Sequence, residues 1–375
     1  MFNLRRQIRL LYTTGILGNL SITGAWVVIM ASRGFSLVQI GFAETVFHIT
    51  SLICEIPSGM LADMYGRKKM LAVGNIMAIT GDIITAISGN FTVACMAMPF
   101  HAMAYNFASG SGDALAYDSM KKVGCESGYE KYNSNQSVIY RIASGISTLC
   151  AGLALYLGYR KAYLISALMG LVTLFFTLKL VEVRVSEQDE DKDKDDIKNG
   201  EDLPRSMFKK LISYFVDSIR FLFRNSKAAK LMFLNSFVGS IDILLLFFLQ
   251  TKLKTAGISN VFLGFALSTM ELGGVVGSKL IVYFKKIKYV YLFIICTVGV
   301  VFGVILEHSG MVPVMVLGGF LSSLCDDAIE IRTNAKLQDM FPSEQRATLV
   351  SISSFTFSVI MIVLSPLAGY FFSIW

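Results

Sequence analysis

Ionisable side chains stand inside several strongly apolar stretches of this sequence, where they are suited to binding a proton or a polar ligand. Glu44, His48 and Glu55 share one such stretch, and at about 100° per helical residue they fall on a single face. Asp242 and Glu271 each stand near the middle of another apolar stretch. Carboxyl and imidazole groups exchange protons, and charged groups within a membrane usually face a partner or a wet cavity. The sequence therefore predicts proton exchange at several of these positions.

Neutral polar residues in the interior of other apolar stretches add candidates for contact with a substrate, namely Asn19, Tyr105 and Asn106. Hydrogen bonds between helices explain these residues equally well, and the same alternative applies to His48. Glu55 belongs to the stretch EIPSG beside a charged loop, so we interpret it as structural. The candidates for substrate contact and proton coupling are Asn19, Glu44, His48, Tyr105, Asn106, Asp242 and Glu271.

The composition places these residues in a membrane protein. Of the 375 residues, 54% are hydrophobic and 16% are charged, with a mean hydropathy of +0.59. Soluble domains carry about 25% charged residues. A scan for apolar stretches of about 20 residues predicts an all-α membrane protein with eleven spans. They cover residues 10–30, 37–58, 69–89, 91–118, 137–157, 162–182, 230–250, 258–283, 289–306, 311–331 and 347–374.

The distribution of basic residues predicts the orientation. With a cytoplasmic N-terminus, only Arg33, Arg160, Lys161, Lys252 and Lys254 of the 34 lysines and arginines fall in outside loops. Cytoplasmic loops of membrane proteins are enriched in Lys and Arg. We therefore expect a multi-pass protein of the cell membrane with its N-terminus inside. The net charge of +7 then needs no nucleic-acid partner.

The sequence offers little support for enzyme chemistry. None of the six cysteines forms a C-x-x-C pair, and there is no P-loop, nucleophile or haem motif. We expect no enzyme activity, no cofactor and no metal. The expected partners are a small-molecule substrate, protons and the lipid bilayer, and the protein is expected to be a monomer.

A charged segment divides the chain. The run SEQDEDKDKDDIKNGED has the composition of a solvated linker. Apolar residues at helical spacing follow it and predict an amphipathic helix on the membrane surface: Phe208, Leu211, Ile212, Phe215, Ile219 and Leu222. The predicted division is an N-terminal bundle over residues 1–182, a cytoplasmic linker over 183–229 and a C-terminal bundle over 230–375.

One loop resembles a known family. Gly59, Asp63, Gly66, Arg67 and Lys68 form G-x-x-x-D-x-x-G-R-K after the second span, which resembles the signature loop of the major facilitator superfamily. The resemblance implies two six-helix bundles. The eleven predicted spans then leave the twelfth helix unaccounted for, so we expect a truncated form. The stretches EIPSG, GSGDALAYDS and RATLVSISS further resemble a bacterial subgroup grouped with drug exporters.

The resemblance also implies a cytoplasmic latch. Asp63 is expected to face the start of the eleventh span near Arg346, and Arg67 to meet Asp118. Asp113 aligns with Asp327 between SGSGDALAY and SLCDDAIEI. Asp113 is also able to pair with Arg141 on the adjacent span. The implied cytoplasmic gate comprises Gly59, Asp63, Gly66, Arg67, Lys68, Asp113, Asp118, Arg141, Asp327 and Arg346. The alternative is a loop that only fixes the topology.

The resemblance implies a secondary transporter that works by alternating access. Export of a lipophilic drug-like compound in exchange for protons is the preferred interpretation. Two departures bear on it, because the fifth span lacks a glycine-proline-rich exporter motif and Asn106 replaces an arginine common in the fourth span. Proton coupling therefore depends on the buried acids. The alternatives are a transporter of a specific metabolite, or a non-transporting membrane sensor or truncated fragment.

Overall fold

A computed structural model describes residues 2–183, 216, 220, 226–284, 286–340 and 346–374. Within these residues all regular structure is helical, which confirms the predicted all-α class. The positions that predict the amphipathic helix between 208 and 222 lie outside the described residues, as does most of the charged linker.

The N-terminal half, residues 2–183, is built from long helices and short ones. It comprises α1 (Leu4–Asn19), α2 (Trp26–Ser32), α3 (Leu37–Tyr65), α4 (Arg67–Ile87), α5 (Phe91–Cys95), α6 (Met98–Ala108), α7 (Ser111–Lys121), α8 (Tyr129–Leu149), α9 (Ala151–Leu157) and α10 (Tyr159–Leu178). Local sequence sets several boundaries. Ser36 and Gln39 form a reciprocal capping box at the start of α3. Gly66, with φ 106°, separates α3 from α4.

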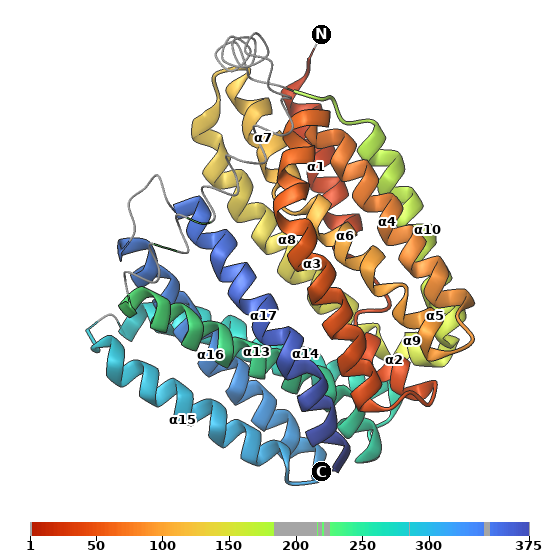
Figure 1. Ribbon diagram of the computed structural model, residues 1–375, viewed down its shortest axis with the longest axis vertical. Helices are drawn as coiled ribbons and strands as arrows, with labels where there is room; N and C mark the ends of the chain where they lie inside the picture. Colours follow the sequence, from red (N-terminus) through yellow and green to blue (C-terminus); the bar gives the residue numbers. More distant parts are fainter. Residues whose placement is uncertain are drawn as a thin grey trace.

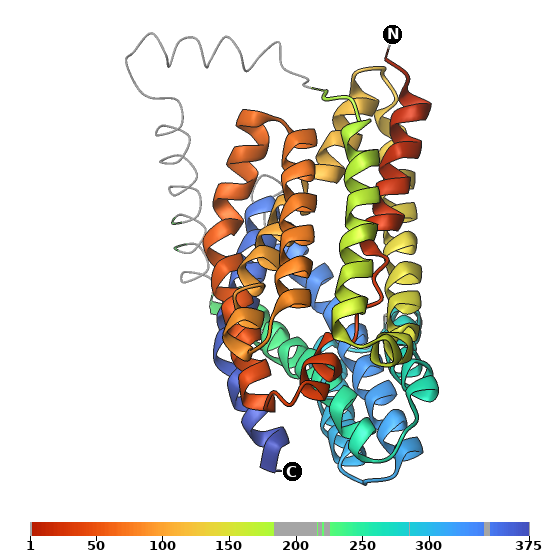
Figure 2. The same ribbon diagram turned by 90° about the vertical axis from the view of Figure 1, so that its right-hand side faces the viewer.

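The C-terminal half, residues 226–374, has fewer breaks. It comprises α13 (Ser226–Thr255), α14 (Asn260–Leu280), α15 (Tyr289–Glu307), α16 (Val312–Met340) and α17 (Arg346–Ile374). Figure 1 shows α13 to α16 as a group tilted against the N-terminal half, and in both views the two chain ends lie at opposite ends of the molecule (Figures 1 and 2).

The expected eleven membrane spans are not confirmed. In the described part of the chain, eight helices are long and apolar enough to cross a membrane, and a ninth is possible if α8 and α9, bent by 43°, count as one span. The first predicted span is interrupted between Asn19 and Trp26, and the fourth is divided among α5, α6 and α7. Average hydropathy does not report whether the backbone is one continuous helix, which explains the difference.

The two halves meet along two helix pairs that pack closely. Gly41 of α3 lies against the Ser365 carbonyl of α17, and Gly369 lies against Leu37. On the other side, Gly264 of α14 lies against the Leu149 carbonyl of α8. None of the three glycine positions leaves room for a Cβ without movement of the facing backbone, so small residues are required for this approach.

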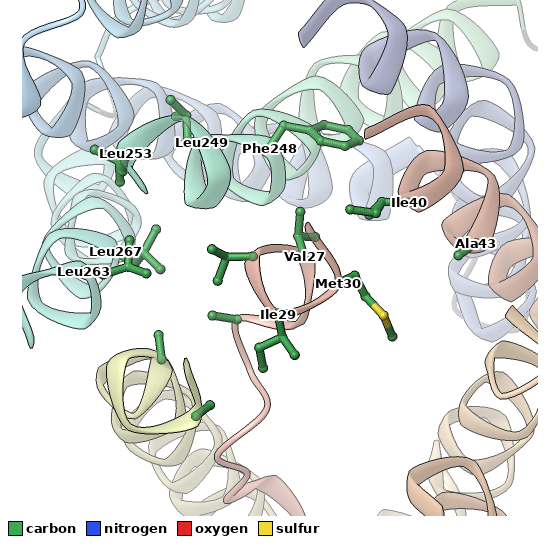
Figure 3. Close-up of a cluster of buried hydrophobic side chains, with 14 of the residues drawn as sticks. Val27, Ile29, Met30, Ile40, Ala43, Phe248, Leu249, Leu253, Leu263 and Leu267 are labelled. Atoms are coloured by element: carbon green, nitrogen blue, oxygen red, sulfur yellow. The ribbon is translucent and has the colours of Figure 1, made fainter. Parts of the chain in front are cut away.

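Buried apolar side chains close the interface at the end of the molecule that carries the C-terminus. We name this cluster the apolar closure. It joins α2 to α13 and α14 through Val27, Ile29, Met30, Phe248, Leu249, Leu253, Leu263 and Leu267 (Figure 3). Val27, Leu249 and Leu263 are each 0% exposed. Gln250 adds a polar contact, because its Oε1 accepts a hydrogen bond from the Val28 N–H at 3.3 Å. At the opposite end, the two halves stand apart (Figure 1).

Candidate functional site

A cavity of about 1340 Å³ lies between the two halves. Its lining comes from both of them, including Glu44 and His48 of α3, Asp242 of α13 and Glu271 of α14. Trp26 of α2 and Phe247 of α13 line it next to the apolar closure, with their rings edge to face at 5.8 Å. The cavity thus extends to the apolar closure from the opposite end of the molecule, where the two halves stand apart. It is lined by short helices such as α6 and by long ones such as α13.

Six of the seven predicted substrate and coupling residues line this cavity: Glu44, His48, Tyr105, Asn106, Asp242 and Glu271. Asn19 does not belong to the lining. Its Nδ2 donates instead to the Gly15 carbonyl of its own helix at 2.7 Å, close to the end of α1. Asn19 is the last residue of α1, and its side chain bonds to that helix end rather than facing the cavity.

On α3, His48 connects an acid to the opposite half. Its Nε2 lies 3.3 Å from Glu44 Oε1, and its Nδ1 lies 3.4 Å from the Ser358 hydroxyl of α17. The interhelical hydrogen bond proposed for His48 is therefore present, and the side chain lines the cavity as well. Glu55, interpreted from sequence as structural, also lines the cavity.

On α6, Tyr105 and Asn106 have different surroundings. The Asn106 side chain is 4% exposed, and its Nδ2 donates to Ser51 Oγ at 2.9 Å and to the Ala102 carbonyl at 2.8 Å. Asn106 therefore joins α6 to α3. Tyr105 is 62% exposed and lies 6.4 Å from Phe47, ring to ring. Tyr105 is the better placed of the two to contact a molecule in the cavity.

In the C-terminal half, two acids line the cavity with different partners. Asp242 is 5% exposed; its Oδ2 accepts from Ser323 Oγ at 3.4 Å, while its Oδ1 has no hydrogen-bond partner among the described residues. Glu271 Oε1 accepts from Thr148 Oγ1 of α8 at 2.9 Å. Glu271 thus joins the two halves, whereas Asp242 remains within its own.

Arg141 pairs with Asp327 rather than with Asp113. The Arg141 and Asp327 side chains approach to 4.0 Å across the two halves, and no ion pair between Arg141 and Asp113 is present among the described residues. Asp113 lies in the first turn of α7, where a helix N-terminus favours a negative charge. The expected pairing was wrong because α8 faces α16 at the level of Arg141, which adjacency along the chain does not reveal.

The signature loop holds α3, α4 and α7 together. Arg67 forms ion pairs with Asp118 and, at 3.8 Å, with Asp63, and its Nη1 donates to the Ala114 carbonyl at 2.8 Å. The Asp63 side chain is 60% exposed, and its partial desolvation raises its pKa; the Arg67 charge opposes that shift and Asp118 adds to it. The Arg346 side chain lies outside the described residues, so the expected contact of Asp63 with the start of α17 stays a prediction.

Glu182, which sequence reasoning did not select, caps α4. Its Oε1 and Oε2 accept hydrogen bonds from the N–H groups of Arg67 and Lys68 at 3.0 and 2.9 Å. The same carboxylate fills the space beside Gly66, which explains why a Cβ is excluded there in addition to the positive φ. At Gly59, by contrast, a Cβ would meet nothing within 4 Å, so no helix in the described part of the chain packs tightly against it.

Four further Asp, Glu or His residues line the cavity without having been selected from the sequence as site residues. Asp326 and Glu330 come from α16, where Asp326 directly precedes Asp327; Asp82 and His101 come from α4 and α6. The repeat comparison aligned only Asp327 of the two adjacent aspartates. The Asp-Asp pair in SLCDDAIEI was the available signal for Asp326. In the described part of the chain, no group of three His, Cys, Asp or Glu side chains is placed to hold a metal ion.

Two sets of membrane-crossing helices with a cavity between them, lined by acidic and aromatic side chains, are the architecture of a membrane transport protein. The chain belongs to the Major Facilitator Superfamily, whose family model matches residues 10–366. The resemblance seen in the signature loop is confirmed at the level of the superfamily.

Comparisons with individual proteins agree with this assignment. The chain is 23% identical over 333 residues to the uncharacterized MFS-type transporter YxaM of Bacillus subtilis (strain 168), a match that covers 88% of this chain and 79% of that protein. Its fold is similar to that of the nucleoside transporter NupG, with a TM-score of 0.74 at 15% identity, covering 98% of this chain and 91% of that one. A D-xylose–proton symporter is also similar, with a TM-score of 0.66 at 11% identity, covering 96% and 88%.

Proposed function

We propose that the protein moves a small molecule across the plasma membrane by alternating access, with its N-terminus in the cytoplasm. The observation that carries this proposal is the cavity, which lies between the halves and ends at the apolar closure. A site with one closed and one separated end is the arrangement expected when the two halves rock around a central site. In this orientation the structure is open to the cytoplasm.

Coupling to protons is the second part of the proposal. Asp242 and Glu271 line the cavity in the C-terminal half, while Glu44 and His48 form a contacting pair in the N-terminal half. A carboxylate in a membrane interior is costly unless a proton or another cation neutralises it, so such groups mark proton and ion pathways. The superfamily includes a D-xylose–proton symporter of similar fold, which supports proton coupling as a mechanism available to this architecture.

Export of a lipophilic drug-like compound remains the preferred mode. Aromatic rings surround the cavity, and aromatic and apolar side chains supply most of the contact area for drug-sized ligands. The rings belong to Trp26, Phe47, Tyr105, Phe247 and Phe357. The resemblance of EIPSG and GSGDALAYDS to a drug-exporter subgroup points the same way.

A transporter of a specific polar metabolite is the second candidate. Two observations favour it: asparagine side chains at 75, 106, 235 and 334 line the cavity, and the fold is similar to transporters of nucleosides and of D-xylose. Asn and Ser side chains both donate and accept hydrogen bonds, as recognition of a hydroxylated ligand requires. Either candidate uses the same cavity and the same motion.

The signature loop is proposed to act when the cytoplasmic side closes. Asp63 and Arg67 then connect α3 and α4 to the start of α17, while Asp113 and the Arg141–Asp327 pair stabilise charges near the inner opening.

The orientation has its own test: impermeant maleimide added to intact cells should label Lys161→Cys and should not label Lys192→Cys. Labelling confined to Lys192→Cys would reverse the orientation.

The transport proposal is tested with purified full-length chain in proteoliposomes carrying an imposed pH gradient. Radiolabelled uridine, D-xylose and ethidium represent the metabolite and drug-like candidates. Gradient-dependent movement of one of them, absent from empty liposomes, supports the proposal. Thermal unfolding is measured to show that the protein is folded. If it is folded and every compound moves equally in protein-containing and empty liposomes, the non-transporting alternative is favoured.

A further inference from the structure

Acidic side chains outnumber basic ones in the cavity lining. The described lining includes eight Asp or Glu residues, one arginine and no lysine. A cleft lined by one sign of charge attracts ligands of the opposite sign, and low-dielectric walls strengthen that attraction. If the cavity is the transport site put forward above, its acidic lining indicates the charge of the substrate.

The single arginine does not neutralise the acids that lie deepest in the C-terminal half. Arg141 pairs with Asp327, and it leaves the adjacent Asp326 and the facing Asp242 without an ion pair among the described residues. Glu44 is paired with His48 and Glu271 accepts from Thr148. Glu55, Asp82 and Glu330 also lack an ion pair among the described residues, but of the unpaired lining acids Asp242 and Asp326 are the two that are buried.

These two carboxyl groups form a compact site between α13 and α16. The Asp326 carboxylate lies against Gly239, one turn before Asp242, and the two aspartates are close enough to repel each other electrostatically. They are 5% and 7% exposed, and both line the cavity. Ser323 donates to one oxygen of Asp242, which leaves the other oxygen, Oδ1, buried and without a hydrogen-bond partner in the described residues.

A buried acceptor with no partner costs free energy, and two adjacent buried carboxylates add repulsion. A cationic donor placed between them removes both penalties at once. Aromatic faces elsewhere in the cavity, including Tyr105 and Phe357, suit an organic cation because rings attract cations and also cover apolar groups.

We propose that the transported molecule is an organic cation whose positively charged group is bound by Asp242 and Asp326. This inference rests on the proposed transport function and specifies its substrate class. The proton and the substrate then bind the same pair of carboxylates, and each excludes the other. Exchange of protons for substrate follows from that competition without a separate coupling site.

The test uses purified full-length chain in detergent and two ions of the same shape, tetraphenylphosphonium and tetraphenylborate, which have opposite charges. Binding is measured by equilibrium dialysis at neutral and acid pH, in sodium and in sodium-free buffer. The expected result is binding of tetraphenylphosphonium alone, weakened by acid and unchanged by sodium. Asp242→Asn and Asp326→Asn should each weaken it about 10-fold, because each removes one of the two negative charges that attract the ion.

Glu307→Gln is the matched control. Glu307 is also a buried acid of the C-terminal half, 1% exposed with one oxygen lacking a hydrogen-bond partner among the described residues, but it does not line the cavity. Its variant should weaken tetraphenylphosphonium binding less than either aspartate variant does, because Glu307 repels Asp242 but does not line the cavity. Thermal unfolding of all three variants establishes that each is folded.

Three results would overturn the inference: no binding of tetraphenylphosphonium, equal binding of both ions, or binding unaffected by both aspartate variants. Displacement of the cation by sodium would assign the aspartate pair to an inorganic ion and would also overturn it. Movement of uridine or D-xylose in proteoliposomes, together with no cation binding, would reject the cationic substrate and leave the transport function standing. Cation binding without gradient-driven movement would support the cation site and contradict the transport function.

Discussion

Arg141 of α8 and Asp327 of α16 approach to 4.0 Å across the two halves of the protein. Their side chains are 54% and 31% exposed, so solvent screens the pair. Such pairs contribute about 0.2–1 kcal/mol. A contribution of this size leaves overall stability nearly unchanged, but about 1 kcal/mol is a factor of about five between two conformations.

Arg141→Gln should therefore alter the balance of conformations more than it alters folding. We expect little change in thermal unfolding and up to a fivefold change in the ratio of open to closed populations, measured by distances between spin labels. Asp327→Asn should produce the same change, and the double variant should add nothing further, because both single changes remove the same contact. Additive effects of the two changes would show that the pair is not a functional contact.

Asp63→Asn tests the latch in the signature loop. Removing a charge near a helix N-terminus costs about 0.3–2 kcal/mol, or a factor of roughly 2 to 30 in a two-state ratio. The variant should express normally and shift toward the cytoplasm-open conformation. Unaltered populations and transport would reduce the loop to a signal for topology.

The pKa of Asp63 predicts the direction in which pH changes the balance of conformations. Partial desolvation and the nearby Asp118 raise the pKa of Asp63 above the ordinary aspartate value against the opposing Arg67 charge, although the side chain is 60% exposed, so acidification neutralises it earlier and Asp63→Asn imitates the acidified protein. Lowering the pH should shift the parent toward the cytoplasm-open state through this residue, and the shift should be smaller in Asp63→Asn. An identical pH response in parent and variant would assign the titration elsewhere.

Asp242→Asn tests proton coupling. Because the amide cannot take up a proton, transport driven by a pH gradient should be lost, whereas exchange of substrate without a gradient should persist once the substrate concentration is raised to offset the weaker binding. Glu271→Gln should either do the same or change the range of substrates, since Glu271 contacts Thr148 in the other half. Full gradient-driven transport by both variants would make Glu44 and His48 the leading candidates for proton binding.

Gly264→Ala tests the close packing of α14 against α8. A Cβ at Gly264 would overlap the Leu149 carbonyl, so the two helices must separate. Overpacking of this kind costs about 1–3 kcal/mol. The thermal unfolding temperature of the variant should therefore fall. At Gly145 a Cβ meets nothing within 4 Å, so Gly145→Ala should leave the unfolding temperature unchanged. Equal stability of the two variants would mean that α8 and α14 do not pack this tightly.

The sequence predicted residue types better than it predicted partners. Hydropathy located the eight helices among the described residues that are long and apolar enough to cross a membrane. Isolated charges in apolar stretches identified Asp242 and Glu271, because such residues face an interior cavity when they occur in membranes. The break between Asn19 and Trp26 escaped prediction, since average hydropathy ignores backbone continuity.

Partner choice depends on how distant helices are placed, which chain order does not specify. Arg141 pairs with Asp327, nearly two hundred positions away, instead of with Asp113 on the preceding helix. Glu182 caps α4 from the end of α10 for the same reason. Resemblance to a family overcame this difficulty only where a motif recorded the contact, as it did for Arg67 and Asp118.

The central claim is that the two halves rock so that the cavity opens to one side at a time. Spin labels at the two ends of the same helix pair, α4 and α16, measure this most directly, with Lys69→Cys and Ala335→Cys at one end and Ile87→Cys and Met311→Cys at the other, in a cysteine-free background. As pH is varied between about 5 and about 8, where histidine and coupled acids titrate, the account predicts opposite changes: when the first distance shortens, the second lengthens. Distances that both stay fixed, or that change in the same direction, would contradict alternating access.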